Sequence, residues 1–317
     1  MSPLRRIAFG NRRWTILGWL CIAVPGMAQT NQIDRSQLLR GNAPPSPLVP
    51  TGLSTEELEY APHSENDADL GTQRILKAIE EYKPWTVQFG LPIYYTSNVA
   101  LVRNGEQSDA VFTPGIGLTY QPRITKTLYC EFSLQHQFFE YAQFDEFDFT
   151  SFDAIAGLAY YLPQFHNLSL RARYDFNRLT DNGSDQFFTN HQVVLAAEMP
   201  FQFSRAHHLL VGGSVDISME ANPVHSQRDD YETFVAYALS LSRSFSVDAA
   251  ARIAVHNYRL GDRVDLNEML SFSANYRLAD WLAVGAISSF AWSQSNHSVF
   301  DYSVANLGGA VTVTVRF

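Results

Sequence analysis

Acidic and arginine side chains recur at every second position in several segments whose other positions are apolar. Near residue 171, for example, Arg171 and Arg173 alternate with Leu170 and Ala172. Successive side chains of a strand point to opposite faces, so these charges share one face. The positions concerned are Glu131, Asp153, Arg171, Arg173, Asp175, Glu198, Asp216, Asp248 and Arg252.

Opposite charges that line a narrow passage create a transverse field and a constriction. The set holds six acids and, when Arg316 is included, four arginines, so its acidic excess would favour cations. Arg171 follows one predicted turn and Glu198 precedes the next, so the hairpin between them can set the two side chains together. Bracing of the wall by ion pairs is an equally open interpretation, because enclosed charges are usually paired.

The sequence lacks the spacing of a catalytic set. A nucleophilic serine needs a base within hydrogen-bond reach, and no His-x-Ser occurs. His136 and His191 lack such a serine partner. His207 and His208 are adjacent, so in a strand they point to opposite faces and are unsuited to one metal site. We therefore expect no enzymatic activity, no cofactor and no metal.

The charged positions lie on segments with a period of two that run from Trp85 to Phe317. About twelve segments can be counted, and their connections alternate between a shorter set and a longer, more acidic set. Leu282 and Trp292, on one face of the eleventh segment, would lie roughly 26 Å apart along a tilted strand, which matches an apolar membrane belt. The segments lie near 85–102, 110–121, 127–143, 151–162, 168–180, 187–202, 207–221, 229–242, 245–259, 265–278, 281–294 and 302–317.

The residues before position 85 have a different composition. Residues 1–28 combine four arginines, an apolar run and a small-x-small site, which predicts a signal peptide and export. Residues 29–84 predict a periplasmic linker that is Pro-rich at first and contains a short amphipathic helix at 67–82. Without residues 1–28 the net charge of −9 becomes −13, which argues against nucleic acid as a partner. Cys130 is then the remaining cysteine, and its parity predicts that it faces lipid.

The sequence ends in VTVTVRF, in which every second residue is apolar: Val311, Val313, Val315 and Phe317. With this ending and the alternation before it, residues 85–317 resemble bacterial outer-membrane β-barrel proteins of the porin-like class. The resemblance implies an all-β fold, a closed antiparallel transmembrane β-barrel of about twelve strands in the bacterial outer membrane. It also implies that these four C-terminal residues are a signal for the barrel assembly machinery. It further implies that outer-membrane lipid and surface glycolipid contact the barrel. Gly309 departs from the pattern, because many members have a large apolar residue there.

Small residues at inward positions, such as Gly157, Ala236 and Gly285, are too small to fill a lumen of twelve strands. They predict a narrow water-filled passage, unless the N-terminal helix occupies it. The expected function is passive diffusion of small, preferentially cationic or neutral solutes. Two alternatives stay open: a structural or envelope-anchoring barrel without transport, and an autotransporter-like secretion barrel threaded by the helix. The solute and the oligomeric state are not determined by the sequence.

Overall fold

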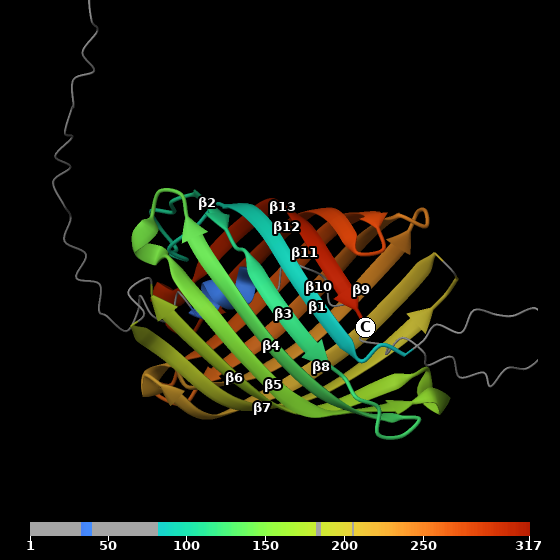
Figure 1. The fold of residues 1–317 in the computed structure, drawn as a ribbon. Helices are drawn as coiled ribbons and strands as arrows, with labels where there is room; N and C mark the ends of the chain where they lie inside the picture. The colour runs from blue at the N-terminus through green and yellow to red at the C-terminus, as the bar shows by residue number, and fades with distance from the viewer. Residues whose placement is uncertain (1–32, 40–81, 182–184, 205) are drawn as a thin grey trace, which may run out of the picture.

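The computed structural model describes residues 33–39, 82–181, 185–204 and 206–317. Their strands form one antiparallel sheet in which β13 pairs with β1, so the sheet closes into a barrel (Figure 1). β2 and β3 are two pieces of one broken strand, so the predicted count of twelve is confirmed. The segments are β1 (Trp85–Thr96), β2 (Asp109–Phe112), β3 (Gly115–Tyr120), β4 (Leu128–Tyr141), β5 (Phe149–Leu162), β6 (Leu168–Asp181), β7 (Gln186–Gln202), β8 (His207–Asn222), β9 (Arg228–Ser240), β10 (Phe245–Tyr258), β11 (Val264–Ala279), β12 (Leu282–Ser295) and β13 (Tyr302–Arg316).

The break between β2 and β3 falls at Thr113 and Pro114. A proline has no N–H to donate, so it interrupts a ladder of backbone hydrogen bonds. The flanking groups remain bonded: Thr113 N donates to Pro92 O at 2.9 Å, and Phe138 N donates to Pro114 O at 2.9 Å. The prediction of one strand over 110–121 therefore identified the position of the strand and missed its interruption.

The seam between β1 and β13 runs in register from Thr86 opposite Arg316 to Thr96 opposite Asn306. At its end, the N–H groups of Trp85 and Phe317 each donate to the carbonyl of the other at 3.0 Å. A Cβ at Gly308 would lie 2.2 Å from Ile93 O, so only glycine fits this close approach. Closure leaves no free sheet edge, which matters in lipid because an unpaired backbone group there costs several kcal/mol.

Inward and outward side chains alternate as predicted. In β4, for example, Tyr129 and Glu131 are buried, whereas Phe132 and Leu134 are exposed. Outward aromatic rings form a row near Phe317: its ring lies 6.4 Å from that of Trp85, which in turn stacks on Tyr120 at 4.1 Å. Such a row is typical of the aromatic girdle of a membrane barrel.

The two ends of the barrel differ. We call the end that carries Trp85 and Phe317 the turn end, and the opposite end, which carries residues 97–108, the loop end. The loop-end segment 97–108 is the longest connection and folds inward, since Val99 and Leu101 are buried. At the same end, short 3-10 turns lie at Asp145–Phe147, Val224–Ser226 and Ser298–Phe300.

A helix of residues 33–39 lies inside the barrel, near the loop end (Figure 1). We call it the lumen helix. All of its residues except Gln37 are buried, so this part of residues 29–84 packs inside the barrel. The predicted signal peptide and nearly all of the helix predicted at 67–82 lie outside the described residues. Of that segment only Tyr82 is described, and it is not helical. Among the described residues, no helix combines the length and apolar character needed to cross a bilayer.

Candidate functional site in the lumen

The lumen helix is seated on apolar side chains from many strands. Ile33 and Leu39 belong to one buried cluster and Leu38 to a second. A cavity of only about 10 Å³ remains between the helix and the wall near Asn98 and Val304. That is room for one water at most. The first cluster also includes Tyr94, Val99, Val111, Phe139, Tyr141, Phe149, Leu179, Phe188 and Ala221, and the second includes Leu101, Met269, Ala291, Tyr302 and Val304.

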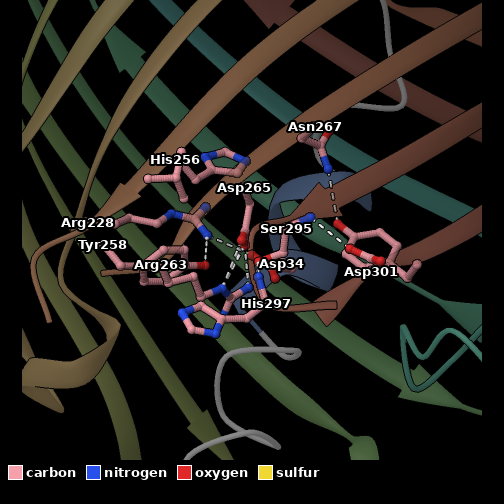
Figure 2. Close-up of polar contacts among 12 residues, drawn as sticks. Asp34, Arg228, His256, Tyr258, Arg263, Asp265, Asn267, Ser295, His297 and Asp301 are labelled. Atoms are coloured by element: carbon pink, nitrogen blue, oxygen red, sulfur yellow. Dashed lines mark hydrogen bonds and ion pairs between the residues drawn. The ribbon is translucent and has the colours of Figure 1, made fainter. Parts of the chain in front are cut away.

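Arg228, the first residue of β9, ties the lumen helix to the wall (Figure 2). Its Nη1 donates to Asp34 Oδ1 and to Tyr258 Oη, each at 2.8 Å. Its Nη2 donates to Gln37 of the helix, and its Nε lies 3.0 Å from Asp230 Oδ1. The side chain is only 6% exposed, so this charge is stable in the lumen because acceptors surround it.

Further charged groups continue this network along β10 and β11. His256 Nδ1 lies 2.7 Å from Asp230 Oδ1. Arg263 donates from Nε to Asp265 Oδ2 at 2.8 Å, and its guanidinium lies 4.1 Å from the centre of the Tyr258 ring. We call Asp34, Arg228, Asp230, His256, Tyr258, Arg263 and Asp265 the loop-end charge cluster. In Figure 2, Arg228, Tyr258, Arg263 and Asp265 surround Asp34 of the lumen helix.

Loop residues cover the lumen helix on its other side. The Arg35 guanidinium lies 4.1 Å from the centre of the Phe147 ring, in the connection between β4 and β5. Burial lowers the pKa of Arg35 from its usual value, which reflects the loss of hydrating water. Arg263 likewise lies 3.5 Å from the centre of the Phe300 ring, in the connection between β12 and β13. One loop therefore contacts the lumen helix through Arg35, and a second loop contacts Arg263 of the loop-end charge cluster. Both contacts are cation–π pairs.

The turn-end half of the lumen has a different charge arrangement. Arg171 lies between two acids, with Nε 3.7 Å from Glu131 Oε1 and Nη2 3.4 Å from Glu198 Oε2. The hairpin geometry that the sequence suggested for Arg171 and Glu198 is thus realised, with Glu131 of β4 as an additional partner. Asp248 accepts hydrogen bonds from Ser273 at 3.1 Å and Asn275 at 3.0 Å.

The nine predicted lumen charges all occupy the inward-facing positions of their strands. Asp153 accepts a 2.6 Å hydrogen bond from Asn177 Nδ2, and Asp175 accepts a longer one, 3.4 Å, from Gln192. Their contribution to selectivity stays a prediction. So does the role of the C-terminal residues Val311, Val313, Val315 and Phe317 in assembly, although all four lie on the outward face.

A cavity of about 300 Å³ lies at the rim of the turn end. It is lined by the turns that contain Arg243 and Trp281, and by inward residues such as Asn275, Ala283 and Thr312. A larger depression of about 920 Å³ is lined mainly by outward residues such as Leu170, and so belongs to the lipid-facing wall. Elsewhere at the turn end, Tyr129 and Tyr161 are buried and Tyr82 packs against them, so this half contains both open and filled regions. The predicted passage stays a prediction.

Sequence reasoning missed most of the loop-end charge cluster. Arg228 and Asp230 share parity with Ala236 in β9, which had been predicted to face inward, so the same rule would have found them. Nothing in the sequence pairs Asp34 with Arg228, because 194 positions separate them.

Of the histidines considered for chemistry, His136, His191 and His207 lie on the outer wall, whereas His208 shares parity with the buried Leu210. The Tyr174 hydroxyl and His191 Nδ1 are 2.5 Å apart, and His207 bonds to Tyr237. Within the described ranges, no group of three or more His, Cys, Asp or Glu side chains is arranged to hold a metal ion.

No protein-family model matches the chain, and no curated protein matches it. Among solved structures, it is similar to an outer membrane channel from Pseudomonas putida F1, with a TM-score of 0.54, 11% identity, and coverage of 74% of this chain and 97% of that chain. It is also similar to the NanC porin, with a TM-score of 0.43, 7% identity, and coverage of 71% and 98%. The first likeness shows the fold, which is that of the porin-like outer-membrane β-barrels, as predicted.

Proposed function

We propose that this protein is an outer-membrane β-barrel that forms a narrow porin-like channel, and that the lumen helix blocks it. The observation that supports this most directly is the contrast along one lumen. The turn half holds a cavity of about 300 Å³, whereas about 10 Å³ remains beside the helix. Open space at the turn end that leads to a helix held only by non-covalent contacts fits a blocked channel better than a barrel packed throughout.

The balance of energies suggests that the lumen helix is removable. Burial of Ile33, Leu38 and Leu39 contributes about 1.5–3 kcal/mol each. Ordering seven residues costs about 1–2 kcal/mol each. The ordering cost is the larger sum, so the polar contacts from Arg228 to Asp34 and Gln37 decide whether the helix stays in place.

We further propose that the opened channel prefers small cations or neutral solutes. Of the nine predicted lumen charges, six are acids and three are arginines, whereas Arg243, Arg277 and Asp280 line the rim of the turn-end cavity. Charges that line a narrow passage set its ion preference, so the acidic excess supports this direction.

Two other functions remain as alternatives. An envelope-anchoring barrel would also need a closed wall and a stable plug. An autotransporter-like barrel would carry a chain segment through its lumen, and the lumen helix gives this alternative some support. Neither alternative accounts for the small side chains around the turn-end cavity.

The test is conductance in planar bilayers. The variant that lacks residues 29–40 should conduct steadily, whereas the chain that retains them should be closed for most of the time. The matched control lacks residues 45–56, an equal number from the same N-terminal region, and should behave like the unaltered chain. If both deletion variants are electrically silent although correctly folded, the channel proposal fails and the anchoring alternative replaces it.

A further inference from the structure

The seat of the lumen helix combines a directed cation with an apolar surface. Arg228 points its Nη1 and Nη2 groups at Asp34 and Gln37, while Leu38 packs in the cluster that contains Met269 and Tyr302. We propose that this seat is a binding site for an amphipathic monocarboxylate, which displaces the lumen helix by replacing Asp34 on Arg228.

The donors of Arg228 divide between the wall and the helix. Nε is held by Asp230, and Nη1 also bonds to Tyr258, so the guanidinium keeps its orientation when the helix leaves. The donors directed at Asp34 and Gln37 then lose their acceptors. The two oxygens of one carboxylate fit the planar edge of a guanidinium, so a single ligand group can replace both side chains.

The neighbouring groups restrict the rest of the ligand. Apolar side chains surround Leu38, so the body of the ligand should be an alkyl chain or a ring without charge. A second carboxylate would meet Asp230 and Asp265, whose own cations are already engaged with them. Like charges without a free cation repel, so one carboxylate is favoured over two.

This inference rests on the proposed function for its meaning in transport, because it names the class of ligand that opens the channel. The preference for cations is proposed for small ions that pass Glu131 and Glu198 in the turn half, whereas the carboxylate would bind in the loop half. Binding can be measured without any current, so the two proposals can fail separately.

The first experiment compares three probes with the same eight-carbon chain: octanoate, octanol and octylammonium. Each is titrated against the full chain in lipid nanodiscs, and empty nanodiscs correct for partition into lipid. Octanoate should bind at least tenfold more tightly than the other two. Equal binding of octanoate and octanol would overturn the proposal, because the carboxylate would then be irrelevant.

The second experiment uses variants of the two partners. Asp34→Asn weakens the competing helix contact, so octanoate should bind several-fold more tightly. Arg228→Gln should abolish the preference for octanoate over octanol, and Arg228→Lys should retain part of it because the charge remains. Heat-modifiable gel migration checks that each variant is folded.

The matched control is Arg103→Gln, which removes an exposed ion pair with Asp301 and should leave octanoate binding unchanged. An unchanged preference in folded Arg228→Gln would contradict the proposal. If the variant without residues 29–40 conducts but octanoate does not bind the full chain, only the ligand proposal fails. If octanoate binds as described but that variant is silent, only the channel proposal fails.

Discussion

The two halves of the lumen are built on the same twelve strands and yet differ in their contents. The turn half combines small inward residues, charges that pair across neighbouring strands, such as Arg171 with Glu198, and one small cluster of buried tyrosines, Tyr129 and Tyr161. The loop half is filled by aromatic rings, such as the Phe139–Phe149 stack with ring centres 4.2 Å apart, and by the lumen helix. The comparison teaches that strand number sets the width of a barrel, whereas the inward side chains and inserted segments decide whether that width is open.

The largest effect on the difference between the two halves is expected when the lumen helix is displaced from the wall without being deleted. Replacing both Leu38 and Leu39 with Asn removes apolar burial worth about 3–6 kcal/mol in total, and it should change the protein from mostly closed to mostly open. Planar-bilayer recordings measure this. Arg123→Gln, at the turn end and away from the helix, is the control and should remain closed. A closed double variant would show that the wall itself blocks the lumen.

A second prediction concerns stability. Phe149 is 1% exposed, so Phe149→Ala should lower the free energy of unfolding by about 3–5 kcal/mol, through lost burial and a new cavity. Thr312 lines the existing cavity at the turn end. The matched change Thr312→Ala should therefore alter the free energy of unfolding by less than about 1 kcal/mol. Urea titration in detergent or lipid gives both values. Equal losses would mean that the two halves are packed alike.

A third prediction addresses ion preference in the opened variant without residues 29–40. Arg171→Gln leaves Glu131 and Glu198 without their shared cation, so the preference for cations should rise about two- to fivefold. Glu198→Gln should lower it. Reversal potentials in a salt gradient provide the measurement. If neither substitution shifts the potential, these charges brace the wall and do not select ions.

The smallest effect is expected for the native thiol. Cys130 is half-buried and shares parity with the exposed Phe132, so a membrane-impermeant thiol reagent should label it slowly in the folded barrel. Ser214→Cys, at an inward position, should label faster in the opened variant. Rapid labelling of Cys130 from water would place the register off by one residue and exchange the inner and outer faces.

The barrel and its register could be predicted from the sequence because period-two alternation is a local property of each strand. The same local rule predicted that Arg171 and Glu198 could pair, because one hairpin joins their strands. The lumen helix could not be found in this way. Residues 33–39 have few apolar positions and lie in a Pro-rich region, and their burial depends on wall residues such as Arg228 and Phe188 that are distant in sequence. A local pattern carries no information about such partners.

The seam between β1 and β13 also has a consequence for the order of folding. Thr86 pairs with Arg316, which lies 230 positions later, whereas the other strands pair with close neighbours along the chain. The entropic cost of joining two residues grows with the length of chain between them, so hairpins should form early and this pairing last. Until then, two strand edges remain exposed. Because the approach at Gly308 tolerates no side chain, a Gly308→Val variant should accumulate as a nearly complete but unclosed intermediate that proteases digest, rather than as an unfolded chain.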